Sequence, residues 1–220
     1  MFKLIVKDLL IQKKYFLFIV LFSLIGLFFV HSHPAVYYAA SSTIIAYCCI
    51  MTAIFLDDKN NSQLLLNSLP IRRRDIVLAK YLSVIVYTAA GLAATALIGG
   101  LASVAAPSYA VRPAGFFDII ASLGTAIILC SIYFPIYFKL INARALAPIN
   151  MFLLCFVINI FMQNVMGFSN PYNKPPLTYL LTMWKWVPDW ALAMAVMVIG
   201  LAFMSASLII SSVIYQNKDL

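Results

Sequence analysis

The feature that most constrains the fold is a series of apolar stretches, each long enough to cross a lipid bilayer. A membrane-spanning α-helix needs about twenty consecutive, predominantly apolar residues. The six candidate stretches lie at residues 15–31, 37–56, 80–106, 117–138, 146–166 and 188–214. Hydrophobic residues make up 64% of the chain and charged residues only 10%, which leaves too little polar surface for a soluble domain. We therefore expect one all-α membrane domain over residues 1–220, with six transmembrane helices.

The distribution of lysine and arginine predicts the orientation of these helices. If both termini lie in the cytosol, the cytoplasmic segments contain twelve Lys and Arg residues and the outer segments contain three. Cytoplasmic loops of membrane proteins carry such an excess, so the formal charge of +8 does not require nucleic acid as a partner. We expect a multi-pass protein of the bacterial cell membrane with its N- and C-termini in the cytosol.

Two segments outside the spans have distinctive patterns. Residues 1–14 place lysines on one helical face and apolar residues on another, which favours an amphipathic helix in the headgroup layer. A basic lead-in without that structure is the alternative. Residues 167–187 begin with a Pro- and Asn-rich turn and continue with about ten apolar and aromatic residues, too few to span the bilayer. Their length and aromatic content are typical of a re-entrant or interfacial helix on the outer side.

Small residues in the third span indicate close helix packing. Gly91, Thr95 and Gly99 recur every four residues, and so do Ala96 and Gly100. Residues of this size at this spacing let helix backbones approach closely in lipid.

Amides make the fifth span the most polar of the six. The residues concerned are Asn150, Asn159, Gln163 and Asn164. In lipid an amide must find a hydrogen-bond partner or water. Asn159 and Gln163 are four residues apart and share a helical face. Two interpretations remain open for this face, a contact between helices and a surface that lines a substrate pathway.

The sequence lacks the motifs of most enzymes and ion-coupled transporters. No glycine is followed by lysine, which excludes a Walker A phosphate-binding loop. There is no glutamate, and the seven aspartates fall near expected helix ends or in loops, so we expect no buried charges in the membrane. The two histidines and four cysteines lack the spacing of a metal site. We expect no catalytic site, metal or cofactor in this chain, and energy for uphill transport would have to come from another polypeptide.

The longest polar interruption within the first hundred residues, at positions 57–80, separates the second and third spans. Its first part is residues 61–69, within which Gln63 through Ser68 can form one or two helical turns after an N-cap at Asn60, Asn61 or Ser62. This part contains four leucines, Leu64, Leu65, Leu66 and Leu69. Exposed leucines on a cytosolic loop imply a protein partner or burial in the membrane.

Pro70 begins a second helix in this interruption, because proline is favoured at the first helical position. Three basic residues follow it directly, namely Arg72, Arg73 and Arg74. They would anchor to anionic lipid or contact a protein partner, and both interpretations remain open. If this helix continues unbroken to Ala106, its length is about 55 Å, well beyond a hydrocarbon core of roughly 30 Å.

The run NSQLLLNSLPIRRRDIVLAKYL, at residues 61–82, resembles the corresponding loop of the type-2 ATP-binding-cassette (ABC) exporter permeases. The order of segments is similar too, especially to the small permeases for bacitracin-type, lantibiotic and amphipathic toxin peptides. The resemblance implies a permease subunit that works with a separate ATPase subunit, which binds the ATP and Mg, and with a second permease subunit, identical or paralogous.

The resemblance also implies roles for individual residues. The element that docks on the ATPase subunit would comprise Asn61, Ser62, Gln63, Leu64, Leu65, Leu66, Asn67, Ser68 and Leu69, with Arg72 and Arg73 as further contacts. The helix at 2–14 would rest above that subunit, and residues 177–187 would match the outer re-entrant helices. The expected function is ATP-driven export of an amphipathic or lipophilic substrate, with a peptide as the expected class. A non-transporting membrane subunit for peptide sensing or immunity is the alternative.

Overall fold

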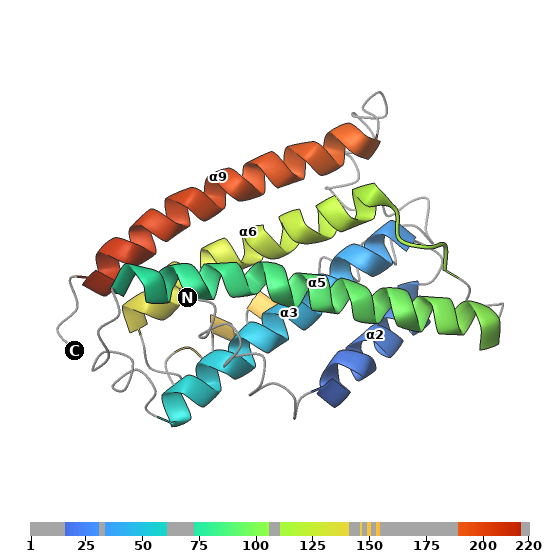
Figure 1. The fold of residues 1–220 in the computed structure, drawn as a ribbon, viewed down its shortest axis with the longest axis horizontal. Coiled ribbons are helices and arrows are strands. Elements are labelled where there is room, and N and C mark those ends of the chain that lie inside the picture. The colour runs from blue at the N-terminus through green and yellow to red at the C-terminus, as the bar shows by residue number, and fades with distance from the viewer. Residues whose placement is uncertain are drawn as a thin grey trace, which may run out of the picture.

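The computed structural model describes residues 16–30, 34–60, 73–105, 111–140 and 189–216, together with residues 146, 149–150 and 153–154. Within these ranges the chain forms five long α-helices and no strand (Figure 1). The helices are α2 (Phe16–Val30), α3 (Pro34–Lys59), α5 (Arg73–Ala105), α6 (Phe116–Leu140) and α9 (Asp189–Gln216). All except α2 are long and apolar enough to cross a membrane, judged by length and composition. The prediction of an all-α, multi-pass membrane protein is confirmed.

Five of the six expected spans coincide with described helices to within three residues at each end, except that α5 begins seven residues before the expected third span. α5 begins at Arg73 and continues unbroken for 33 residues, which corresponds to about 50 Å. The prediction of one long helix through the loop border is therefore confirmed from Arg73 onward. The segments at 1–14, 61–72 and 167–187, and most of 146–166, lie outside the described residues. The interfacial helix, the coupling turn, the re-entrant segment and the count of six spans accordingly stay predictions.

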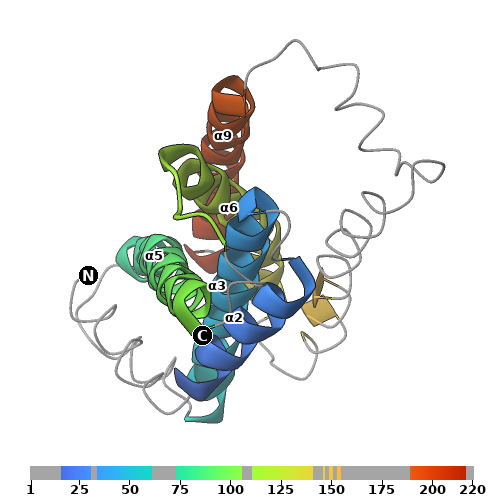
Figure 2. The ribbon, with the colours of Figure 1, turned by 90° about the vertical axis from the view of Figure 1, so that its right-hand side faces the viewer.

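The five helices form a bundle in which α5 crosses the others. Of the described helices, α5 has substantial contacts with α2, α3, α6 and α9. Figures 1 and 2 show α9 at one edge of the bundle and α2 at the opposite edge, with α3 and α6 between them. We call the end of the bundle where α3 ends and α5 begins the loop end.

Large aromatic side chains fill the interior at the helix contacts. The largest fully buried side chains include Tyr37, Tyr38, Tyr47, Tyr81, Tyr133 and Phe134. Aliphatic side chains of α5 and α9 cover much of the outside, with Leu97 and Leu101 at 69% and 70% exposure and Ile209 at 62%. Such extensive apolar surface suits contact with lipid rather than water.

α6 and α9 make the most extensive helix pair, and they run parallel. In the first half of both helices, a Cβ atom on Gly200 would lie 3.2 Å from the carbonyl oxygen of Gly124. Near their ends, the rings of Phe138 and Tyr215 lie 5.4 Å apart. The contacts therefore run in the same order along both helices, and Figure 1 shows that both end at the loop end of the bundle.

One of the two small-residue stripes predicted on the third span packs against another helix. Gly91, Thr95 and Gly99 are buried on α5, whereas Ala96 and Gly100 are exposed. The backbone of α3 approaches Gly91 closely, whereas no other described helix comes within 4 Å of the Cβ position of Gly100. The predicted close packing is therefore confirmed for the first stripe only.

Candidate functional site

The best-described candidate site is the base of the predicted coupling loop. Residues 61–72 lie outside the described residues, but the helix ends on both sides of them are described. We define the loop base as the last turn of α3, residues 56–59, together with the first turns of α5, residues 73–81. The chain of the loop is joined to the bundle at these two helix ends.

A buried ion pair joins the two helix ends at the loop base. Nζ of Lys80 donates a hydrogen bond to Oδ2 of Asp57 over 2.6 Å. The two side chains expose only 10% and 3% of their surface. Both residues were expected at the borders of the loop, but their pairing was not expected. The two helix ends that flank the loop are therefore joined by a charge contact.

The structure corrects the prediction that the spans contain no buried charges. Asp57 and Asp118 lie near helix ends as expected, yet they expose only 2% and 4% of their surface. Oδ2 of Asp118 lies 3.0 Å from Nη1 of Arg112, and its Oδ1 accepts a hydrogen bond from Nη2, also at 3.0 Å. A buried carboxylate persists when a cation compensates it, and sequence position alone does not reveal that cation.

Arg73 binds the C-terminal end of α9. Its Nη1 atom donates hydrogen bonds to the carbonyl oxygens of Gln216, at 3.0 Å, and Tyr215, at 3.4 Å. A cation at this position satisfies carbonyl groups that lack partners within the helix and complements the helix dipole. Arg73 is the one predicted coupling residue that the structure describes. Its contact joins α5 to α9, and its docking role toward an ATPase subunit stays a prediction.

A hydrogen-bond network around Tyr81, the last residue of the loop base on α5, joins three helices. The hydroxyl of Tyr81 lies 2.6 Å from Oγ of Ser207 and 2.9 Å from Oγ of Ser211. Ser207 in turn donates to the carbonyl oxygen of Ser131 on α6 at 2.6 Å. The ring of Tyr81 also packs on that of Phe134, with 4.6 Å between ring centroids. All of these side chains are buried, so α5, α6 and α9 are fixed to one another close to the loop base.

Replacing Ser207 with alanine is expected to lower the free energy of unfolding by about 1 kcal/mol, because interhelical hydrogen bonds are lost from a buried site. The matched control is Ser205→Ala on the same helix. Ser205 is exposed, and its hydroxyl bonds only within α9, to the carbonyl oxygen of Ala202. Thermal unfolding of both variants in one detergent measures the difference. Equal losses would show that the network does not stabilise the bundle.

A second group of contacts fixes the opposite end of the bundle. The carboxylate of Asp118 accepts a hydrogen bond from the backbone N–H of Gly115 at 2.8 Å, and the N–H of Asp118 donates to the carbonyl of Gly115 at 3.1 Å. This reciprocal pairing caps the start of α6. The hydroxyl of Tyr38 donates to the carbonyl oxygen of Arg112 at 2.9 Å and so ties α3 to the same segment.

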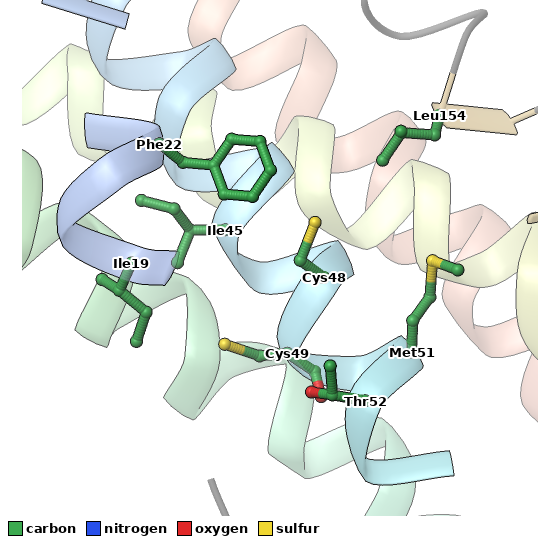
Figure 3. A pocket seen from close by; sticks show the side chains of 8 residues that line it. All are labelled: Ile19, Phe22, Ile45, Cys48, Cys49, Met51, Thr52 and Leu154. Carbon is green, nitrogen blue, oxygen red and sulfur yellow. The ribbon is translucent and has the colours of Figure 1, made fainter. Parts of the chain in front are cut away.

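An apolar pocket of about 330 Å³ lies between α2 and α3, in the half of α3 nearer the loop end (Figure 3). Its lining consists of Ile19, Phe22, Ile45, Cys48, Cys49, Met51, Thr52 and Leu154. None of these side chains is charged, and the hydroxyl of Thr52 donates to the carbonyl oxygen of Cys49 at 2.9 Å. The volume is at the lower end of the range for ligand pockets, roughly 300–1,000 Å³. The pocket can hold an apolar group of moderate size.

Of the four amides of the fifth span, the structure describes only Asn150. Oδ1 of Asn150 accepts a hydrogen bond from the hydroxyl of Tyr47 on α3 at 3.4 Å. This amide therefore makes a contact between segments. Asn159, Gln163 and Asn164 lie outside the described residues, and both interpretations of their role stay predictions.

Residues 3–216 match the family model described as ABC-2 family transporter protein. The chain belongs to this family. It is accordingly a permease subunit of an ABC transporter, and membership implies a separate ATPase partner. No curated protein and no solved structure matches the ABC-2 permease. The resemblance to type-2 ABC permeases is thus confirmed over nearly the whole chain, whereas the likeness to bacitracin and lantibiotic permeases stays a prediction.

Proposed function

We propose that this ABC-2 permease exports an amphipathic or lipophilic substrate, with a peptide as the expected class, when its ATPase partner hydrolyses ATP. The observation that carries the proposal is the position of the apolar pocket relative to the loop base. Thr52 lines the pocket, and Asp57 at the loop base follows five residues later on the same helix, about 7.5 Å along its axis. A displacement of the loop would therefore act directly on a surface that accepts apolar groups.

In this proposal the ATP and Mg bind to the partner, and residues 61–69 dock on it. Four leucines in nine residues give this segment an apolar surface suited to a protein groove. Arg72 adds a further contact to the ATPase subunit. A second permease subunit, identical or paralogous, and the surrounding lipid complete the working unit.

The same proposal includes six spans with both termini in the cytosol. α2, α3, α5 and α6 alternate in direction along the chain, whereas α6 and α9 are parallel. The chain must therefore return to the opposite end of the bundle between Leu140 and Asp189. One crossing at residues 146–166 meets this requirement and supports the count of six.

Replacing Leu65 with aspartate is expected to reduce the ATPase subunit that co-purifies with the permease by about thirty-fold, which corresponds to roughly 2 kcal/mol for a central interface residue. A charge in the docking surface would be left without a partner when the two proteins associate. Leu220→Asp makes the same change in the tail and is expected to leave association unaltered. Unchanged association in Leu65→Asp would contradict the assignment of the coupling segment.

Transport is tested with both subunits in lipid vesicles and a dye-labelled cationic amphipathic peptide as probe. ATP-dependent movement of the peptide across the bilayer supports export. Binding of the peptide without movement would favour the alternative, a non-transporting subunit for sensing or immunity.

A further inference from the structure

We infer that the ion pair between Asp57 and Lys80 makes α3 and α5 move as one unit when the loop is displaced. In this inference the two residues are positioning residues for transport, and they do not serve as a source of stability. The inference rests on the proposed function, because it assumes that force enters through the loop.

The position of the pair is the first argument. Asp57 lies in the last turn of α3, which ends at Lys59, and Lys80 lies two turns after the start of α5 at Arg73. The whole segment between the helices, including residues 61–72, is enclosed by this contact. A push on the loop therefore reaches two helix ends that are already joined, and the ends cannot separate without breaking the ion pair.

The chemistry of the pair is the second argument. Apolar side chains lie next to it along the two helices, since Ile54, Ile76 and Val77 are buried there. Replacing a buried ion pair with apolar side chains of similar volume is often neutral or stabilising. A contact of 2.6 Å between two charged atoms, however, forms at one register of the two helices, and fixing register is the best-attested role of buried charged or polar groups. The pair is thus better suited to fixing the relative position of two helices than to stabilising the bundle.

The neighbouring contacts are the third argument. Lys80 binds α3, and the next residue, Tyr81, binds Ser207 and Ser211 of α9. Two consecutive residues of α5 thus hold two different helices. A displacement of α3 can reach α9 through a single turn of α5, provided that the ion pair is intact.

The experiment compares two double variants of the full chain, assembled with its ATPase subunit in lipid nanodiscs. In Asp57→Leu/Lys80→Met the ion pair becomes an apolar pair, and in Asp57→Lys/Lys80→Asp the charges are exchanged. Cys48, which lines the pocket and is partly exposed, reports movement of α3 after the other cysteines are replaced with alanine. The readout is the change in its labelling rate by the membrane-soluble reagent N-(1-pyrenyl)maleimide when ATP is added.

The apolar variant is expected to unfold at a temperature no lower than the original protein and to retain the ATPase subunit. Its ATP-dependent change in Cys48 labelling is expected to fall at least five-fold, and the exchanged pair is expected to restore at least half of it. A full response in the apolar variant would overturn the inference. An apolar variant that fails to fold would overturn it too, because the pair would then be a source of stability.

Failure of the proposed function gives a different result. The original protein would then show no ATP-dependent change in Cys48 labelling, and Leu65→Asp would leave ATPase association intact. In that case the inference fails together with the proposed function. Failure of the inference alone leaves the response of the original protein and the effect of Leu65→Asp in place, and the apolar variant responds like the original.

Discussion

Replacing Lys80 alone with methionine is expected to lower the free energy of unfolding by about 3–5 kcal/mol, because the carboxylate of Asp57 stays buried without its cation. That side chain exposes only 3% of its surface, so water cannot take the place of the ammonium group without a local rearrangement. Thermal unfolding of the purified permease in detergent, at one pH and one salt concentration, measures the loss.

Lys59→Met is the matched control for this prediction. Lys59 is an exposed residue at the end of α3, and its replacement is expected to change stability by less than about 0.5 kcal/mol. The double variant Asp57→Leu/Lys80→Met is expected to recover all of the stability that the single variant loses, since neither residue then stays buried without the other. If Lys80→Met were as stable as Lys59→Met, water would have to reach the carboxylate of Asp57, and the burial of the pair would be contradicted.

Leucine at position 91 is expected to destabilise the bundle by about 2–3 kcal/mol, because it forces α3 and α5 apart. A Cβ atom at Gly91 would lie 3.2 Å from the carbonyl oxygen of Ser42 and 3.3 Å from its Cα atom. Both are backbone atoms of α3, so no side-chain rotation can relieve the contact. The unfolding temperature of Gly91→Leu in detergent measures the effect.

Gly100→Leu makes the same substitution two and a half turns farther along α5 and serves as the control. Among the described residues, no atom beyond the neighbouring backbone of α5 lies within 4 Å of the Cβ position at Gly100, which is exposed. This variant is expected to equal or exceed the stability of the original chain, because leucine is a better helix former than glycine by about 1 kcal/mol. Equal destabilisation by both substitutions would contradict the packing of the Gly91 stripe against α3.

The spans and the small-residue stripe of α5 could be predicted because their signals are local. An apolar run has to cross the membrane as a helix, since backbone groups in lipid must bond to each other. Residues four apart must share a helical face, so Gly91, Thr95 and Gly99 could be recognised as one stripe. Which stripe faces a neighbour depends on the neighbour, and the equally regular pair Ala96 and Gly100 is exposed.

The contacts at the loop base could not be predicted because they join residues far apart in the chain. Asp57 and Lys80 are separated by 23 positions, and Arg73 meets Gln216 across 143. One signal could have revealed the first pair. Asp57 and Lys80 are the charges of opposite sign nearest to the spans on the two sides of the loop, and charges at that depth need partners. The contact of Arg73 has no comparable signal, since neighbouring arginines offer the same chemistry.

The crossing position of α5 has a consequence for the kinetics of the permease. A helix packed against four neighbours cannot rotate without changing all four contacts, and closely packed interfaces exchange between discrete arrangements rather than deforming gradually. Partly rearranged bundles should therefore be short-lived. A single-molecule distance record across the bundle would then show abrupt steps between two values, with dwell times set by the ATPase cycle and no gradual drift between them.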